Sequence, residues 1–229
     1  MLPPCLPIDY VRVSVMSSMP REDTRVHVSH AENGLVAWLK LPLVFDADEL
    51  LGDVCNISPD WWITHFNRGG YTGNWAIAPL RGPAGEVHPI RMAYSDPTAT
   101  DWVDTPLLES CRAIQRVLAR LECPIKSTRL MRLAAGAQIL EHTDHELGYE
   151  DGEVRLHIPV VTSSDVEFWL NSQRVEMWPG ELWYLNVNLP HRVANRSSQD
   201  RTHLVIDCEV NEWIRALFRP RNWPVNRPT

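Results

Sequence analysis

Two histidines and one aspartate could form a metal centre in this chain. His142 and Asp144 lie two residues apart at the end of a predicted strand, so both side chains project from the same face. His191 opens a later predicted strand, which allows the three side chains to converge. Two imidazoles and one carboxylate leave coordination positions open and suit Fe(II) with dioxygen and a chelating cosubstrate. A His-x-Asp motif alone is weak evidence, because an exposed turn explains it equally well.

An arginine follows the second histidine at the start of the next predicted strand. The guanidinium of Arg201 is planar and permanently charged, so it could bind a dicarboxylate through two hydrogen bonds. A surface ion pair is the alternative interpretation. The neighbouring triad favours a role in binding a cosubstrate.

The elements that must position these side chains are short and of the β type. Eight candidate strands follow one another without a long helix, at 129–133, 137–142, 154–161, 166–170, 174–178, 181–187, 191–195 and 203–209. Such a series predicts a mainly β fold, a jelly roll whose two sheets enclose a central cavity.

The rest of the chain predicts a few flanking elements around this core. Short strand-like pieces occur at 10–15 and 25–28, and Asp46 with Glu49 predicts a capping box that opens a helix to about residue 54. Apolar residues at helical spacing predict one helix over 105–122, and a last helix is predicted over 211–218. We expect one domain over 1–229, made of an N-terminal covering part (1–126), a jelly-roll core (127–210) and a C-terminal helix and tail (211–229).

The predicted barrel contains five segments of recognisable order and spacing. They are 136–144 (GAQILEHTD), 155–160 (RLHIPV), 177–186 (MWPGELWYLN), 188–191 (NLPH) and 201–207 (RTHLVID). Together they resemble the aspartyl/asparaginyl β-hydroxylase family of Fe(II)/2-oxoglutarate dioxygenases, which also contains bacterial proline cis-hydroxylases. The stretch from Trp62 to Trp75 is similar more loosely.

The resemblance implies a double-stranded β-helix with iron on His142, Asp144 and His191. It also implies that Arg201 binds the distal carboxylate of 2-oxoglutarate, and that Arg155 and His157 lie near its metal-chelating end. One position departs from the family pattern. Met131 stands where animal peptide-hydroxylating members carry a serine that helps to hold the cosubstrate.

From this resemblance we expect a 2-oxoglutarate-dependent hydroxylase that acts on an unactivated C–H bond of an amino acid. The amino acid is free or part of a peptide or peptide-like natural product, and dioxygen is consumed with release of succinate and CO2. Ascorbate is the expected reductant in vitro. Substrate contacts are expected in the N-terminal covering segment and in the turn before His191, at Trp62, His65, Asn67, Arg68, Asn186 and Asn188. A turn role for the two asparagines is as plausible as a contact.

Two alternatives stay open at this point. Residues 179–181 followed by 190–195 are similar to the second motif of the cupins, but the first cupin motif would have a histidine where Asp144 stands. A non-catalytic jelly-roll binding module is the other alternative, and the complete triad with Arg201 argues against it.

The amino-acid composition restricts the kinds of binding partner and the cellular location that we expect for this protein. The formal net charge is −7 and the sequence pI is about 5.7, which argues against a nucleic-acid partner. No apolar run approaches the roughly 20 residues of a membrane-spanning helix. The five cysteines contain no Cys-x-x-Cys pair, and the N-terminus lacks the basic start of a signal peptide, so we expect a cytoplasmic protein.

Overall fold

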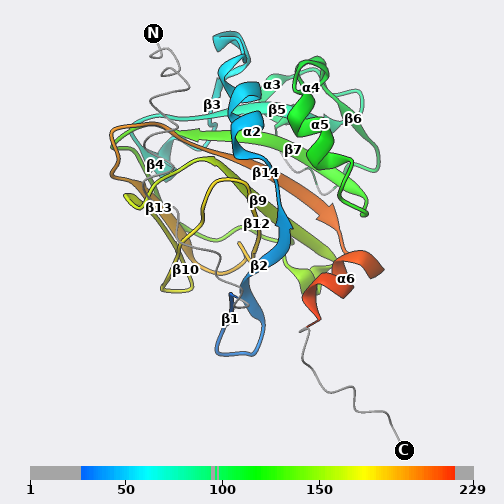
Figure 1. Cartoon of the computed structure of the whole chain (residues 1–229), viewed down its shortest axis with the longest axis vertical. Helices are drawn as coiled ribbons and strands as arrows, with labels where there is room; N and C mark the ends of the chain where they lie inside the picture. Colours follow the sequence, from blue (N-terminus) through cyan, green and yellow to red (C-terminus); the bar gives the residue numbers. More distant parts are fainter. Residues whose placement is uncertain (1–26, 94–95, 97, 220–229) are drawn as a thin grey trace, which may run out of the picture.

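The computed structural model describes residues 27–93, 96 and 98–219, and it is dominated by antiparallel strands (Figure 1). The strands are β1 (Val28–His30), β2 (Val36–Val44), β3 (Ile63–Thr64), β4 (Tyr71–Thr72), β5 (Trp75–Pro83), β6 (Trp102–Asp104), β7 (Ile125–Leu133), β8 (Gln138–His142), β9 (Glu153–Val161), β10 (Val166–Leu170), β11 (Gln173–Val175), β12 (Glu181–Leu185), β13 (His191–Asn195) and β14 (Arg201–Glu209). The α-helices are α2 (Ala47–Cys55), α3 (Pro89–Met92), α4 (Pro106–Ser110), α5 (Arg112–Leu118) and α6 (Glu212–Phe218). Short 3₁₀ turns occur at Pro59–Trp61, Arg68–Gly70 and Tyr149–Asp151.

The strands form two sheets whose order identifies the fold. The large sheet runs β1-β2-β12-β9-β14-β7-β5-β3, with β6 beside β5, and the small sheet runs β11-β10-β13-β8-β4. From β7 onward, successive strands or hairpins alternate between the two sheets, and strands far apart in sequence, such as β7 and β14, are neighbours. This is a double-stranded β-helix, or jelly roll, and the predicted fold class is confirmed.

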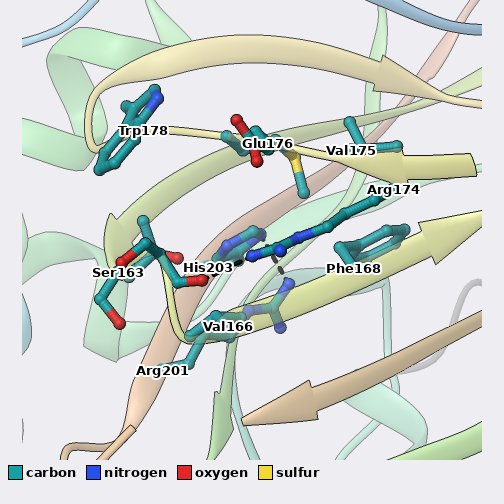
Figure 2. Close-up of a pocket in the computed structure, with 12 residues that line it drawn as sticks. Ser163, Val166, Phe168, Arg174, Val175, Glu176, Trp178, Arg201 and His203 are labelled. Carbon is teal, nitrogen blue, oxygen red and sulfur yellow. Dashed lines mark hydrogen bonds between the residues drawn. The ribbon is translucent and has the colours of Figure 1, made fainter. Parts of the chain in front are cut away.

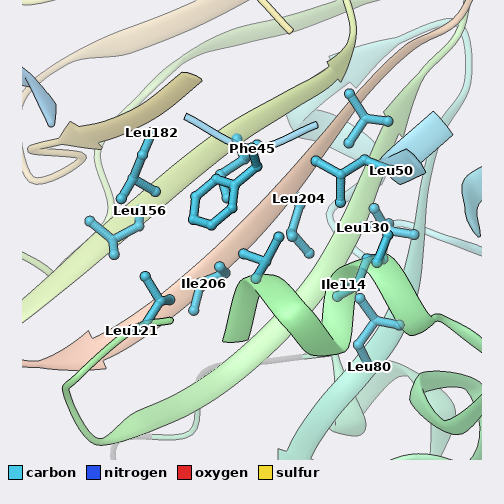
Figure 3. Packing of buried hydrophobic residues seen from close by; sticks show 14 of the residues in the cluster. Phe45, Leu50, Leu80, Ile114, Leu121, Leu130, Leu156, Leu182, Leu204 and Ile206 are labelled. Carbon is cyan, nitrogen blue, oxygen red and sulfur yellow. The ribbon is translucent and has the colours of Figure 1, made fainter. Parts of the chain in front are cut away.

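Successive side chains along the strands of the large sheet point to opposite faces, and the apolar side chains on each face belong to a separate hydrophobic core. Leu130, Leu156 and Leu204 point outward and pack under the helices with Ile114 and Phe45 (Figure 3). The opposite face of the large sheet meets the small sheet. That inner core includes Leu133, Leu185, Ile139, Phe168 and Val193. Residues on the inner face of the large sheet therefore point toward the space between the sheets.

Most predicted strands agree with the structure to within a few residues. Strands β10 and β13 have the predicted bounds, whereas β7 begins four residues early. The predicted strand 174–178 is shorter, because β11 ends at Val175 before the turn that contains Pro179 and Gly180. At Gly180 the φ angle is +81°, and a Cβ atom there would lie 2.2 Å from the Phe45 carbonyl oxygen, so this turn requires glycine.

The helix predicted over 105–122 is wrong as a single element. Cys111 has φ −100° and ψ 77°, which ends α4 and separates it from α5. Leu107, Cys111 and Ile114 are nevertheless buried as the apolar spacing predicted. The spacing therefore identified the buried face correctly but did not detect the break, because both short helices use the same face.

The flanking predictions have mixed outcomes. Asp46 caps α2 by accepting a hydrogen bond from the Glu49 amide (3.0 Å), but the Glu49 carboxylate pairs with Arg116 (2.6 Å). The predicted helix 211–218 is confirmed, with Asn211 as its N-cap. The predicted strand 10–15, the first two residues of the predicted strand 25–28 and the tail after Arg219 lie outside the described residues. No helix in the described part of the chain is long and apolar enough to cross a membrane.

Candidate metal centre

Neighbouring strands of the small sheet bring His142, Asp144 and His191 together. His142 is the last residue of β8 and His191 is the first of β13, and these antiparallel strands place the two histidines directly opposite each other. Asp144 follows β8, and its amide donates to the Val187 carbonyl oxygen (2.8 Å). The possible ligand atoms of the three side chains all lie within 4.8 Å of one another. The convergence expected from the sequence is therefore present in the structure.

Both histidines are oriented by backbone carbonyl groups. The Nδ1 atom of His142 lies 2.8 Å from the Leu140 oxygen, and that of His191 lies 3.0 Å from the Leu189 oxygen. A carbonyl oxygen only accepts, so Nδ1 must carry the hydrogen and a neutral ring keeps its lone pair on Nε2. Burial and the nearby His142 lower the pKa of His191 to about 4, which keeps this ring neutral. The donor set therefore fits a divalent transition metal such as Fe(II).

Asp144 is held by a buried chain of ion pairs. Arg155 donates from Nη1 to Asp144, and from Nε and Nη2 to the two carboxylate oxygens of Asp207 (2.7 and 3.0 Å). Burial alone would raise the pKa of Asp144, but Arg155 and the two histidines outweigh it and the pKa is lowered. The carboxylate is therefore ionised and fixed in direction, as a metal ligand must be.

Asp207 is the centre of this chain of ion pairs. It is fully buried on β14 and also accepts a hydrogen bond from Arg129 Nη1 (2.9 Å). Burial would raise the pKa of this carboxyl, but Arg129 and Arg155 overcome it and hold the pKa well below its usual range. One buried carboxylate thus anchors two arginines, one of which orients a triad member.

A cavity of about 340 Å³ joins the triad to the inner face of the large sheet. Its wall contains all three triad residues together with a set of polar and charged side chains. These are His65, Asn67, Arg129, Glu146, Glu153, Arg155, His157 and Arg201. Met131, the residue that departs from the family pattern, also lines this cavity.

Arg201 is a buried cation without an acidic partner. The side chain is 2% exposed, and no carboxylate lies within ion-pair distance of it in the described part of the chain. Its Nη2 donates to His203 Nδ1 (2.7 Å), whereas its Nε has no hydrogen-bond partner. Burial lowers the pKa of Arg201 to about 9. A buried guanidinium in this condition is suited to an anionic ligand.

Two buried histidines extend this polar wall. The Nε2 atoms of His157 and His203 are buried and have no hydrogen-bond partner among the described residues. Burial, together with Arg201, lowers the pKa of both rings well below the ordinary value, so both are neutral. Arg201 and His203 also line a second pocket of about 50 Å³, beside Phe168 (Figure 2). Unfilled hydrogen-bonding positions of this kind are typical of a binding site.

The six residues predicted to contact substrate fall into two groups. His65 and Asn67 line the cavity, whereas Trp62 and Arg68 do not. The Trp62 ring is covered by the Arg132 guanidinium at 3.6 Å. Arg68 is exposed in a 3₁₀ turn.

Asn186 and Asn188 also lie away from the cavity wall and stabilise neighbouring loops. Asn188 accepts a hydrogen bond from the Leu147 amide (3.2 Å) and donates to Asp151 (2.6 Å). Asn186 accepts a hydrogen bond from the Asn188 amide (3.3 Å). These contacts hold the turn whose Val187 carbonyl positions Asp144.

Sequence reasoning did not identify Arg129 as a site residue. Arg129 alternates with Met131 and Leu133 on β7, so its side chain lies on the inner face of the sheet. The signal was present in the sequence, because a charged residue in phase with inward apolar residues is unusual for a core strand.

Comparison with known proteins agrees with this geometry. The family model described as aspartyl/asparaginyl beta-hydroxylase matches residues 100–210. The chain is 28% identical over 156 residues to an L-proline cis-4-hydroxylase of Rhizobium meliloti (strain 1021), covering 67% of this chain and 54% of that protein. The chain therefore spans about half the length of this curated relative.

Two solved structures are also similar. One is a Pseudomonas putida prolyl-4-hydroxylase, with 13% identity, a TM-score of 0.45 and coverage of 76% of this chain and 93% of that chain. The other is an oxidoreductase of the 2OG-Fe(II) oxygenase family from Burkholderia pseudomallei, with 17% identity, a TM-score of 0.42 and coverage of 66% and 73%. The similarity to the family rests on the sequence match and not on these structures. Over residues 100–210, the chain is similar to the aspartyl/asparaginyl β-hydroxylase family.

Proposed function

We propose that this protein is an Fe(II)- and 2-oxoglutarate-dependent dioxygenase that hydroxylates an unactivated C–H bond of an amino acid, free or within a peptide or peptide-like natural product. Succinate and CO2 are the co-products. The observation that carries the proposal is Arg201, a buried cation without an acidic partner in the described structure, on the wall of the cavity that holds the triad.

His142, Asp144 and His191 would hold the metal, which supplies the activation of dioxygen coupled to oxidation of the cosubstrate. The carbonyl groups of Leu140 and Leu189 keep the Nε2 lone pairs free, and Arg155 keeps Asp144 in place. The protein's contribution is therefore to orient three ligands and to leave the remaining coordination positions open.

Arg201 would bind the distal carboxylate of 2-oxoglutarate. Arg155 and His157 lie on the same cavity wall and would flank its metal-chelating end. The Nε2 of His157 is a buried hydrogen-bonding position that is still unfilled among the described residues. Met131 contributes an apolar contact to this wall where a serine would have contributed a hydroxyl group.

His65 and Asn67 would contact the primary substrate, because both line the cavity that contains the triad. The curated relative is named for L-proline, so L-proline is the first compound to test. We also retain the expected location in the cytoplasm as part of the proposal.

The test is a turnover screen of the purified protein with Fe(II), ascorbate and 2-oxoglutarate. L-Proline, the other amino acids and short peptides are the candidate substrates. We expect succinate release coupled to a gain of one oxygen atom in one class of compound, and no turnover by His191→Ala. Absence of 2-oxoglutarate binding to the metal-loaded protein would contradict the proposal and favour a cupin-type metalloprotein or a binding module.

A further inference from the structure

Arg129 has hydrogen-bonding capacity that the fold does not use. The side chain lies on the cavity wall and is only 2% exposed. Both of its hydrogen bonds come from Nη1, to Asp207 Oδ2 (2.9 Å) and to Ser127 Oγ (3.0 Å). Its Nε and Nη2 donate to no group in the part of the chain that the structure describes. Two nitrogen atoms of a buried guanidinium, with three N–H bonds between them, are therefore available for a ligand.

The charge of Arg129 is also incompletely balanced. Its partner Asp207 is shared with Arg155, whose second partner is Asp144. In the metal-loaded site, the positive groups would be the guanidiniums of Arg129, Arg155 and Arg201 together with a divalent metal ion. The negative groups would be Asp144, Asp207 and a dianionic cosubstrate, so one positive charge would remain unbalanced. The other carboxylates of the wall do not remove this charge, because Glu153 is paired with Lys126 and Glu146 is exposed. An anionic group on the primary substrate would balance it.

His65 supplies a second donor on the wall of the same cavity as Arg129. Its Nδ1 accepts a hydrogen bond from the Asn67 amide (3.2 Å), so the hydrogen of the neutral ring is on Nε2. The ring is stacked on Trp75, with centroids 3.6 Å apart and planes 8° apart, which fixes its orientation. Burial, followed by the neighbouring Arg129, lowers the pKa of His65 to about 4 and keeps this tautomer neutral.

We propose that Arg129 and His65 bind a carboxylate of the primary substrate. This inference rests on the proposed function and narrows its substrate class to compounds with a free carboxylate near the hydroxylated carbon. A free amino acid or the C-terminal residue of a peptide meets this requirement, whereas an internal peptide residue does not. Arg201 does not provide this site, because we assign it to the distal carboxylate of the cosubstrate.

The experiment measures binding, so it does not depend on turnover. Anaerobic protein loaded with Mn(II) and 2-oxoglutarate is titrated calorimetrically with free L-amino acids and with their matched carboxamides. We expect a free acid to bind at least 10-fold more tightly than its carboxamide, since a charge-assisted hydrogen bond is lost. Arg129→Gln should weaken binding of the acid by about 10- to 100-fold and reduce the difference between acid and amide.

Two further variants separate this role from a structural one. His65→Phe keeps the aromatic stack on Trp75 but removes the N–H donor, and it should also weaken binding of the acid. Arg116→Gln removes an exposed arginine paired with Glu49 and should bind like the wild type. Arg129→Gln should retain its affinity for Mn(II) and 2-oxoglutarate.

The outcomes are distinguishable. Any one of three results would overturn the inference. The wild type could bind acids and carboxamides equally, or Arg129→Gln and His65→Phe could both bind the acid as tightly as the wild type does. The third such result is that the wild type binds only peptides with blocked C-termini. If the wild type binds 2-oxoglutarate normally in these cases, the proposed function stands. If the wild type fails to bind 2-oxoglutarate, the proposed function and this inference both fail.

Discussion

Arg155 joins the candidate metal centre to the core by pairing with Asp207 through two parallel hydrogen bonds, Nε to Oδ1 (2.7 Å) and Nη2 to Oδ2 (3.0 Å). The remaining nitrogen, Nη1, donates to Asp144. Since Arg155 cannot move without breaking three hydrogen bonds, the direction of the Asp144 carboxylate is set by a residue on another strand of the large sheet. The following predictions test this arrangement and the assigned role of Arg201.

Replacing Asp207 should destabilise the protein and weaken metal binding. Asp207→Asn leaves two buried guanidiniums with one fewer negative charge, and breaking such a pair costs about 3–5 kcal/mol of the free energy of unfolding. Metal affinity should fall about 10- to 100-fold, because Arg155 no longer orients Asp144 firmly. Urea denaturation and Mn(II) titration measure the two effects. Glu212→Gln, which removes an exposed pair with Arg215, is the control and should change neither. Unchanged metal affinity in Asp207→Asn would show that Arg155 does not need this anchor.

The carboxyl group of Asp207 should also contribute to the loss of folding stability at acidic pH. Arg129 and Arg155 hold the pKa of Asp207 well below its usual range despite its burial, so at low pH the unfolded chain takes up a proton before the native state does. The stabilisation is therefore present above the unfolded pKa of about 4 and is lost as pH falls below it. The difference in free energy of unfolding between the wild type and Asp207→Asn should shrink between about pH 5 and pH 2. Denaturant titrations across this range measure it, and a constant difference would exclude this linkage.

Replacing Arg201 should weaken cosubstrate binding while metal binding persists. Arg201→Gln removes the buried cation opposite the expected distal carboxylate, and the dissociation constant for 2-oxoglutarate should rise about 10- to 100-fold. Calorimetry on the Mn(II)-loaded protein measures this change. Arg196→Gln, which removes an exposed pair with Glu167, should bind 2-oxoglutarate normally. Equal affinities in all three proteins would remove Arg201 from the cosubstrate site.

The sequence by itself determined the β core and the triad. Alternation gave the eight core strands, and the two-residue spacing of His142 and Asp144 placed both on one face, because these are local properties of an extended chain. Periodicity likewise identified the buried face of residues 107–121. The break at Cys111 was not detectable, since both helices bury residues at the same spacing.

Only the tertiary structure decided which polar side chains meet. Asp207 joins Arg155 and Arg129 across 52 and 78 residues of sequence, because β14 lies between β9 and β7 in the large sheet. The tertiary structure also decided that His65 lines the cavity while Trp62 packs under Arg132. Side-chain direction in that irregular segment depends on packing against distant strands, and no repeat in the sequence encodes it.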